Sequence, residues 1–395
     1  MIRDKPPAGW LRYDRLALVS ALVEAKAAIL SLKTVPHQRG WVETLQQMEL
    51  KREVAGTSRI EGAEFTEREL DAALRETPQD LVTRSQRQAR AALDTYKWIA
   101  TIPDDRPVDR DLICQIHSRI VTGADDDHCP PGRIRARDEN VNFGAPRHRG
   151  AEGGQECDDA FQRLAHSLSR EFAEHDPLIQ ALAAHYHLAA IHPFLDGNGR
   201  TARALEALML QRAGLRDTCF IAMSNYYYDE KTAYLRALSD VRENEHELTP
   251  FLTFALKGVE TQTKRLLSEI QHELSKELFR NLMYRLFNRL KTPKRRVIAK
   301  RQLELLNLFL DSDSLTFEET SDRTERVYAS LKNPMKALLR DLNELGGLKA
   351  IRIEKLGPNK YRFSVRLTWP AEMTETAFFE RLKALPKAKT HAFFQ

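Results

Sequence analysis

The chain has 395 residues, 42% hydrophobic and 30% charged, a composition ordinary for a soluble globular protein long enough for two or three domains. Its net charge of +5 is small for this length and does not by itself indicate a nucleic-acid partner. Four scattered cysteines without a Cys-x-x-Cys pair argue against a disulfide framework, and the lack of a signal-peptide core or an apolar run of roughly 18–20 residues predicts a cytoplasmic protein with no membrane partner.

The first 100 residues are expected to form a helical N-terminal region. After an extended arm, the apolar spacing predicts a first helix from Tyr13 to Leu32. A second helix, at about 42–62, ends in Glu61 and Gly62, where glycine is a favoured C-terminal cap. A carboxylate in the last helical turn opposes the helix dipole, so Glu61 is expected to need a cationic partner. The alternative is an ordinary exposed surface glutamate.

Residues 101–260 are expected to hold the functional core. A short helix is predicted from Leu112 to Val121, followed by a long polar loop, 122–154, rich in proline, glycine and arginine. A loop of this length inside a compact domain is more often functional than idle. Within it, Arg133–Arg135 and Asn140–Phe143 alternate in the manner of short strands.

The stretch from His192 to Arg203 reads HPFLDGNGRTAR and concentrates groups suited to one reaction. The apolar run Leu178–Ile191 predicts a buried helix, which Pro193 ends near His192. A further helix is predicted from Arg200 to Arg212, so the turn presents backbone N–H groups and a helix N-terminus, an anion-binding arrangement. His192, with a reference pKa of about 6.5, can accept a proton from an attacking hydroxyl.

The other side chains of this stretch suit a metal and an anion. Asp196 can hold a hard divalent cation, most simply Mg²⁺ bridging to phosphate oxygens. Gly197 and Gly199 allow positive φ and a close approach of phosphate to the backbone. Arg200 and Arg203, three residues apart, are expected to face the same bound anion. The pattern predicts transfer of a phosphorus-containing group; the alternative is a helical corner with a capping aspartate and solvated arginines.

These twelve residues resemble the signature of the Fic (filamentation-induced-by-cAMP) domain, His-Pro-Phe-x-Asp-Gly-Asn-Gly-Arg-x-x-Arg, with every signature position filled. The resemblance extends from about residue 1 to 260. It implies a mainly α fold, a helical bundle with a small β-hairpin flap, that transfers AMP from ATP to a protein hydroxyl. It casts His192 as the catalytic base and Asp196 as the Mg²⁺ ligand. It also implies a set of nucleotide-binding residues: Phe194, Gly197, Asn198, Gly199, Arg200 and Arg203.

A second segment resembles the same family. Thr-x-x-x-Glu-Gly at residues 57–62 is similar to the inhibitory motif of the Fic subgroup that carries an N-terminal inhibitory helix. This likeness implies that Glu61, with Thr57 and Ser58 beside it, pairs with Arg203 and blocks the position of the terminal phosphate of ATP. An enzyme that is inhibited in its resting state is therefore expected.

Two further groups of residues are expected to contact substrates. The long polar loop looks like the Fic flap, which holds a target segment by strand addition, and this implies a role for Val141, Asn142 and Phe143. A hairpin that only covers the helices is nearly as well supported for each side chain. Tyr227 and Tyr234 follow the signature where the family has base-contacting residues, so they could stack on adenine or pack in the core.

The last third of the chain is expected to form a separate module. Residues 261–293 are predicted to be a linker helix, whose leucine stripe would suit an interdomain strut or a homodimer contact. Residues 294–370 resemble a winged-helix (α+β) domain, with a helix, a short strand, two helices and a β-hairpin. Residues 371–395 are expected to be a C-terminal tail. Basic side chains that could contact DNA are Lys332, Lys336, Arg340, Lys355 and Lys360, and a docking or dimerisation module is the alternative.

Three functions remain open on this evidence. The first is a protein adenylyltransferase that modifies a Ser, Thr or Tyr hydroxyl of a protein, or of itself, with ATP and Mg²⁺ and under inhibition by Glu61. The second is removal of AMP with Glu61 as the residue that positions water. The third is a DNA-binding transcriptional regulator whose Fic core senses nucleotide.

Overall fold

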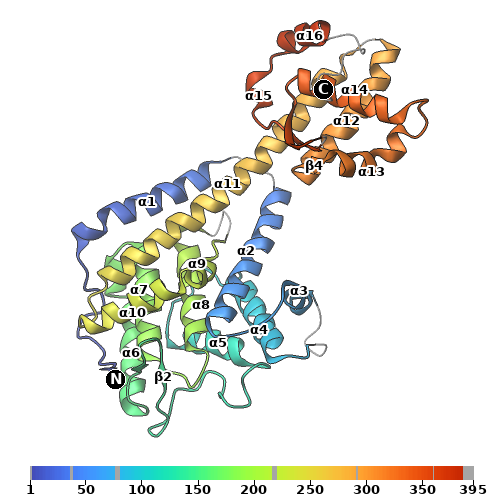
Figure 1. Cartoon of the computed structure of the whole chain (residues 1–395). Coiled ribbons are helices and arrows are strands. Elements are labelled where there is room, and N and C mark those ends of the chain that lie inside the picture. The colour runs from blue at the N-terminus through green and yellow to red at the C-terminus, as the bar shows by residue number, and fades with distance from the viewer. Residues whose placement is uncertain are drawn as a thin grey trace. The chain divides into compact units, whose positions relative to one another are not determined.

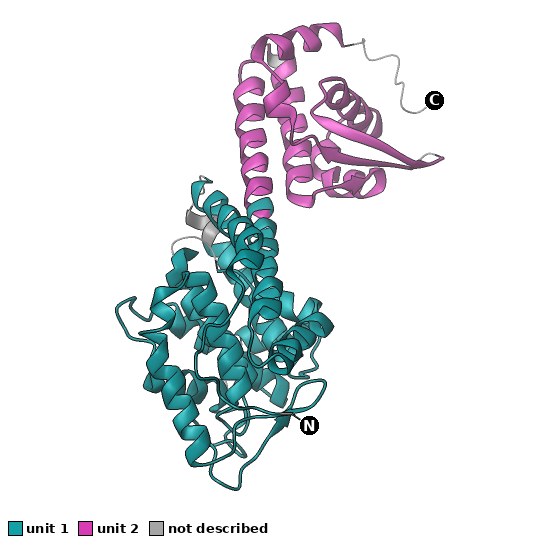
Figure 2. Cartoon of the chain, turned by 90° about the vertical axis from the view of Figure 1, so that its left-hand side faces the viewer, with its two compact units in different colours: residues 1–268 teal, residues 269–395 magenta. Residues whose placement is uncertain are grey.

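The computed structural model describes residues 2–35, 39–75, 81–215, 220–290, 292–358 and 360–385. The chain divides into two compact units, Met1–Ser268 and Glu269–Gln395 (Figure 2). It is mainly α-helical, as the sequence predicted (Figure 1). In the described ranges no helix combines the length and the apolar character needed to cross a bilayer.

The first unit begins with a short strand and a series of helices that lead to the long polar loop. Asp14 caps the first helix through the N–H groups of Leu16 and Ala17, and Thr83 caps the fourth in a reciprocal capping box with Gln86. The elements are β1 (Ile2–Arg3), α1 (Arg15–Thr34), α2 (Arg39–Ile60), α3 (Glu67–Arg75), α4 (Arg84–Ile99) and α5 (Arg110–Val121).

Helices α7 (Pro177–Ile191) and α8 (Asn198–Leu210) pack against each other at the centre of this unit. The side chains of α7 from Leu178 to Ile191 are buried, apart from Gln180, because nearly all of them are alanine or larger apolar residues. Asp176 caps α7 by accepting from the Leu178 N–H (3.0 Å), and Pro177 occupies the first helical position. The two helices therefore form a rigid frame around the turn that joins them.

A three-stranded sheet covers one side of that turn. Strand β2 (Asn142–Phe143) is antiparallel to β3 (His148–Arg149), and β1 is parallel to β3, in the order β1-β3-β2. Strand β2 is consequently an edge strand. No strand forms at Arg133–Arg135 in this described segment, contrary to the sequence expectation, because the Arg135 side chain is buried among backbone carbonyls instead of alternating on a sheet surface.

The remaining elements of the first unit complete the bundle. They are α6 (Gln155–Leu168), η2 (Phe172–Glu174), the π-helical turn η3 (Gln211–Leu215), α9 (Met223–Asp229), α10 (Lys231–Glu243) and the start of α11 (Thr249–Phe287). The sequence predicted a helix after Thr249 and a separate linker helix from Gln262. The structure joins them into one helix of 39 residues, because no proline interrupts it.

The second unit has its own apolar core and the order of elements expected for 294–370. Its elements are the end of α11, α12 (Pro293–Ser312), β4 (Leu315–Thr316), α13 (Phe317–Tyr328), α14 (Pro334–Gly347), β5 (Ile351–Gly357), β6 (Lys360–Val365), α15 (Trp369–Glu372) and α16 (Glu375–Ala384). The antiparallel sheet has the order β4-β6-β5.

Residues 371–385 are part of this core and not a tail, since Met373 and Phe378 are buried in it; residues 386–395 lie outside the described residues. Among the basic side chains considered for DNA contact, Arg340 is half-buried and donates to Asp341 (3.2 Å). The four lysines of that set are exposed.

Candidate functional site

His192 lies at the C-terminal end of α7 in a left-handed conformation, with φ +56°. Its Nδ1 is 3.0 Å from the Ala189 carbonyl. Because a carbonyl only accepts, Nδ1 carries the proton and the neutral ring keeps Nε2 as an acceptor. Burial lowers the pKa of His192 to about 3. The ring borders a cavity of about 700 Å³, so the site contains an unprotonated base at neutral pH.

The pH dependence of the reaction should reflect this lowered pKa. A base whose pKa is lowered is already unprotonated well below pH 6.5, so its protonation removes activity only under more acidic conditions. We expect kcat/KM for nucleotide transfer by a Glu61→Gly variant to show no acid limb near pH 6.5, and to fall only below about pH 5. A profile measured from pH 4.5 to 8.5 with an acid limb near 6.5 would contradict this environment for His192.

The turn after His192 is closed by its own side chains. The Asn198 amide accepts from the Phe194 N–H (2.9 Å) and donates to the Phe194 carbonyl (2.8 Å). The Phe194 ring is fully buried and stacks on His117, with 3.7 Å between ring centroids. Phe194 is therefore a core residue and not a direct nucleotide contact, which corrects the sequence expectation. The Asn198 side chain likewise shapes the loop, while the backbone around it borders the cavity.

His117, which the sequence analysis missed, supports the same loop from α5. Its Nδ1 accepts from the Gly132 N–H (2.9 Å), which leaves Nε2 to donate to the Asp196 carbonyl (3.1 Å). Burial lowers the pKa of His117 to about 4, so the ring remains neutral and rigidly oriented at physiological pH.

The two signature arginines do not face one anion. Arg203 borders the cavity, whereas Arg200 is buried and donates to Asp125 (2.6 Å). Arg200 also lies 3.4 Å from Asp196. The expectation that both guanidinium groups hold the same phosphate was wrong, because a buried aspartate from a distant loop neutralises Arg200.

Arg203 is bound by the end of α2. Its Nη2 donates to Glu61 Oε1 (2.6 Å) and to the Thr57 carbonyl (3.2 Å), and its Nε donates to Thr57 Oγ1 (2.9 Å). Ser58, which the sequence grouped with these residues, is buried, and its hydroxyl makes no hydrogen bond with any residue in the described ranges. Burial by itself raises the pKa of Glu61, but the charge and hydrogen bond of Arg203 lower it below its ordinary value.

The position of Glu61 follows from how α2 ends. Gly62 has φ +91°. Its N–H donates to the Arg59 carbonyl, and the Ala63 N–H donates to the Ser58 carbonyl, which is a Schellman motif. The motif turns the Glu61 carboxylate toward the N-terminus of α8. A Cβ at Gly199 would overlap this carboxylate, so Gly199 allows the anion to approach the first turn of α8.

Helix α2 is anchored by buried acids that contact α9 and α11. Glu53 accepts from the Ser224 N–H (2.7 Å) and the Tyr96 hydroxyl (2.7 Å), and Glu49 accepts from Arg265 (2.5 Å). Burial raises the pKa of Glu53 to about 7. These contacts fix the register of α2 and hence the place of Glu61.

Gly56 offers a way to disturb α2 without touching Glu61. A Cβ at Gly56 would lie 2.5 Å from backbone atoms of Ser224 and Asn225, so alanine must push α2 away from α9. We expect Gly56→Ala to raise the initial rate of nucleotide transfer several-fold, less than removal of Glu61 does. The exposed Gln47 on the same helix gives the control Gln47→Ala, which should leave the rate unchanged. Equal rates for the two variants would contradict a coupling between the packing of α2 and the site.

Asp196 is the residue best placed to hold a metal. It borders the cavity, and its side chain is 37% exposed. Burial raises its pKa, but the charge of Arg200 and the hydrogen bond with His128 lower it, so it is ionised. A carboxylate at the edge of a cavity that also contains the α8 N-terminus and Arg203 fits Mg²⁺, which binds proteins through one or two carboxylates plus phosphate oxygens.

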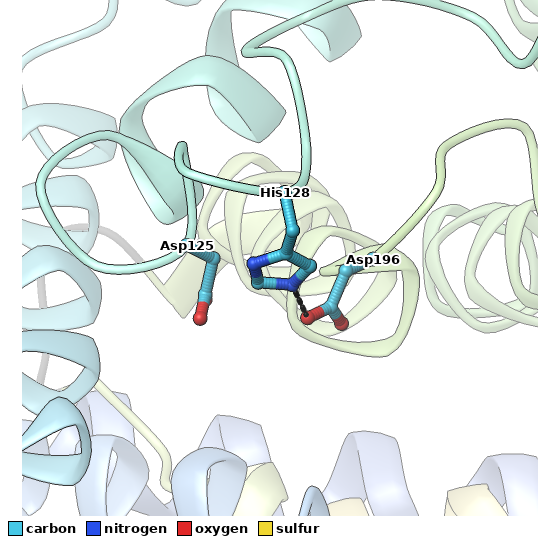
Figure 3. Close-up of side chains that lie close together, drawn as sticks. All are labelled: Asp125, His128 and Asp196. Carbon is cyan, nitrogen blue, oxygen red and sulfur yellow. Dashed lines mark hydrogen bonds and ion pairs between the residues drawn. The ribbon is translucent and has the colours of Figure 1, made fainter.

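Two further ligand-type side chains, which the sequence analysis missed, lie beside Asp196. In Figure 3 the side chains of Asp125, His128 and Asp196 converge. Their ligand atoms lie within 4.8 Å of one another. Arg84 already lies among them, since its Nη2 is 2.6 Å from Asp125, 3.2 Å from His128 and 3.3 Å from Asp196. The positive charge of Arg84 therefore already compensates the two carboxylates. Asp196 is the member of the cluster that borders the cavity.

The segment expected to be a target-docking flap lies close to His192. Val141, Asn142 and Phe143 border the cavity, and Phe143 stacks on His192 with 3.7 Å between centroids. Of the two tyrosines considered for adenine, Tyr234 borders the cavity. Tyr227 does not belong to its lining: it is fully buried and donates to Glu206 (2.9 Å), which makes it a core residue.

Comparison with known proteins identifies relatives of the central segment. Residues 107–210 match the sequence model of the Fic/DOC family. The Drosophila virilis protein adenylyltransferase Fic is 38% identical over 96 residues, which are 24% of this chain and 18% of that protein. The Caenorhabditis elegans protein adenylyltransferase fic-1 is 33% identical over 97 residues, 24% of this chain and 17% of that protein. The match thus spans less than a fifth of the length of these curated relatives.

Solved structures share the fold at low identity. A Fic family protein from Desulfovibrio desulfuricans G20 superposes with a TM-score of 0.57 at 18% identity, covering 92% of this chain and 98% of that one. A fragment of C. elegans Fic-1 gives a TM-score of 0.53 at 20% identity, covering 64% of this chain and 73% of that one. At these identities the likeness concerns the fold alone.

Proposed function

The chain carries a Fic/DOC-family domain at residues 107–210, as its signature predicted, and on this premise we propose that it is a protein adenylyltransferase held inactive by Glu61. The substrates would be ATP and a Ser, Thr or Tyr hydroxyl of a protein. If that hydroxyl belongs to this chain, the enzyme would modify itself. The observation that carries the proposal is the meeting of an unprotonated His192, the α8 N-terminus and Arg203 in one cavity.

In the proposed reaction His192 Nε2 takes the proton from the target hydroxyl, and the oxygen attacks the α-phosphorus of ATP. A bond forms between this oxygen and phosphorus while the bond from the α-phosphorus to the bridging oxygen breaks, and pyrophosphate leaves with the electron pair. The first-turn amides of α8, at Asn198 and Gly199, have no acceptor within the helix and can donate to the phosphate oxygens. Arg203 would hold the terminal phosphate.

Mg²⁺, when bound, would neutralise charge on the phosphates, and Asp196 would hold it. On the base side, Leu235 and Leu238 of α10, which border the cavity, would provide an apolar wall for adenine. The edge strand β2 provides unpaired backbone groups for a target segment, with Phe143 beside His192.

Autoinhibition rests on the same geometry. Glu61 occupies Arg203 and the approach to the α8 N-terminus, the two features that would bind the terminal phosphate. A carboxylate there repels phosphate. It also pairs with Arg203, the signature arginine that borders the cavity, so that this arginine cannot bind phosphate. The proposal therefore requires that α2 moves, or that Glu61 turns away, before transfer.

A second candidate within the same site is removal of AMP from a modified protein. Glu61 and His192 border the same cavity, so a water molecule activated by the carboxylate would meet an AMP ester held beside the histidine. The two reactions differ in their dependence on Glu61, since its loss favours transfer and abolishes removal.

The test uses ATP labelled at either the α- or the γ-phosphate with the full-length Glu61→Gly protein and a His192→Ala double variant. AMP transfer places the α-label but not the γ-label on protein, and the double variant should remain unlabelled. A γ-label on protein would indicate phosphorylation instead. Absence of any label from the Glu61→Gly protein, with itself and a lysate as acceptors, would refute the transferase proposal.

A further inference from the structure

Arg242, near the end of α10, is a buried cation with no ion-pair partner among the described residues. The residue is 8% exposed, its Nε has no hydrogen bond, and the part of the chain that the structure describes provides no ion pair for its guanidinium. Burial lowers the pKa of Arg242 below its ordinary value. A buried, unpaired guanidinium is costly, so such a group is typical of a site that awaits an anionic ligand.

The surroundings of Arg242 compensate it only in part. Its guanidinium carbon lies 4.6 Å from the centroid of the Phe143 ring, and the charge of the buried Asp4 acts on it from a distance. Within the described residues neither oxygen of Asp4 accepts a hydrogen bond, although Oδ1 lies 3.6 Å from His246 Nε2. His148, on the neighbouring strand β3, is also buried and its Nδ1 has no partner. Arg242 and His148 border the same cavity, and of the two only His148 has a hydrogen-bond partner among the described residues, Ser239 at 3.2 Å from its Nε2.

This end is the flap end of the cavity. Tyr234, Leu238 and Arg242 follow one another at helical spacing along the cavity face of α10, over about 12 Å. Tyr234 lies near Arg203, where the terminal phosphate would bind. Burial raises the pKa of the Tyr234 hydroxyl, whereas the charge of Arg203 and a hydrogen bond with it act to lower this pKa. Arg242 lies at the other extreme, 3.9 Å from a Cβ built on Gly144 in the flap turn.

A target segment added to the edge strand β2 would run past this group. Side chains two residues apart on a strand point to the same face and are about 7 Å apart. With the target hydroxyl at His192, the next side chain on that face would approach Phe143 and the guanidinium that covers it.

We propose that Arg242 selects targets that carry an aspartate or glutamate two residues from the modified hydroxyl. The proposal rests on the proposed transferase function and adds the class of target, an acidic segment in extended conformation. The carboxylate would receive charge-assisted hydrogen bonds from the Arg242 guanidinium. Arg242 is thus a specificity-determining residue and takes no part in the proton transfer.

The experiment uses the full-length Glu61→Gly chain, α-labelled ATP and a peptide library with a central Ser, Thr or Tyr and randomised flanks. Labelled peptides should show Asp and Glu enriched about tenfold over Lys and Arg at one position two residues from the hydroxyl. Arg242→Gln should abolish this enrichment, and Arg242→Lys should retain part of it. Arg236→Gln changes an exposed arginine of the same helix and should leave the selection intact.

Several results would overturn the proposal. Absence of acidic enrichment would do so, as would enrichment that survives Arg242→Gln. A raised KM for ATP in Arg242→Gln with unchanged peptide selection would place Arg242 in the nucleotide site. If no peptide is labelled, the transferase proposal fails for peptides. The role of Arg242 is then tested separately, by capturing the same library on the immobilised chain and sequencing the bound peptides. Acidic enrichment that depends on Arg242 would uphold it, and its absence would refute it.

Discussion

In the Glu61→Gly variant, the initial rate of AMP transfer is expected to rise at least about tenfold over that of the unmodified chain. The substitution removes the 2.6 Å contact that occupies Arg203 and the negative charge beside the α8 N-terminus. Both changes favour a bound terminal phosphate. Tenfold corresponds to about 1.4 kcal/mol, a modest value chosen because the Glu61 side chain is 35% exposed and solvent screens its pairing. Label from α-labelled ATP on protein, followed over time, measures the rate.

A matched substitution separates charge from shape. Glu61→Gln keeps the side-chain volume and removes the charge, so its rate should lie between those of the unmodified chain and Glu61→Gly. The KM for ATP should fall in both variants, because the block acts on phosphate binding. An initial rate in Glu61→Gly that equals or falls below that of the unmodified chain would remove the basis for autoinhibition.

The local chemistry of the site could be predicted from the sequence, because it is encoded in consecutive residues. Pro193 after an apolar helix fixes where His192 lies, and the glycine at 197 takes a left-handed conformation that ordinary side chains disfavour. The helix ending at Gly62 also follows local rules, through its Schellman motif. In such segments each residue has few alternatives, so the pattern determines the geometry.

The partners of those residues could not be predicted in the same way. Asp125 and His128 lie in a polar loop with many similar charges, and nothing local marks the one that meets Arg200 or Asp196. Phe194 and Tyr227 have side chains that suit either a ligand or a core, and only tertiary burial decides between them. Resemblance to the family supplied the pairing of residues as distant as Glu61 and Arg203, which spacing alone does not give.

Arg135 is the clearest case of a residue whose partners could not be predicted from the sequence. Its replacement is the second prediction with a large effect. The sequence suggested a strand residue, but the side chain is 1% exposed and donates to the carbonyls of His192 (2.7 Å), Glu139 (2.7 Å) and Ala151 (2.7 Å). Arg135→Met would remove these three hydrogen bonds and leave the buried Ala151 carbonyl unsatisfied, which alone costs about 1–3 kcal/mol. We expect the free energy of unfolding, measured with urea, to fall by at least about 3 kcal/mol.

Activity should fall further than this loss of folded protein explains. The Arg135 bond to the His192 carbonyl holds the residue whose left-handed backbone directs the imidazole, and such a conformation persists only when its surroundings enforce it. In the Glu61→Gly background, we therefore expect Arg135→Met to lower kcat at least tenfold at temperatures where the protein is folded. Arg133→Met, at a 42% exposed arginine two residues away, should change stability by less than about 0.5 kcal/mol. Equal stability and kcat in the two methionine variants would show that the loop holds His192 without Arg135.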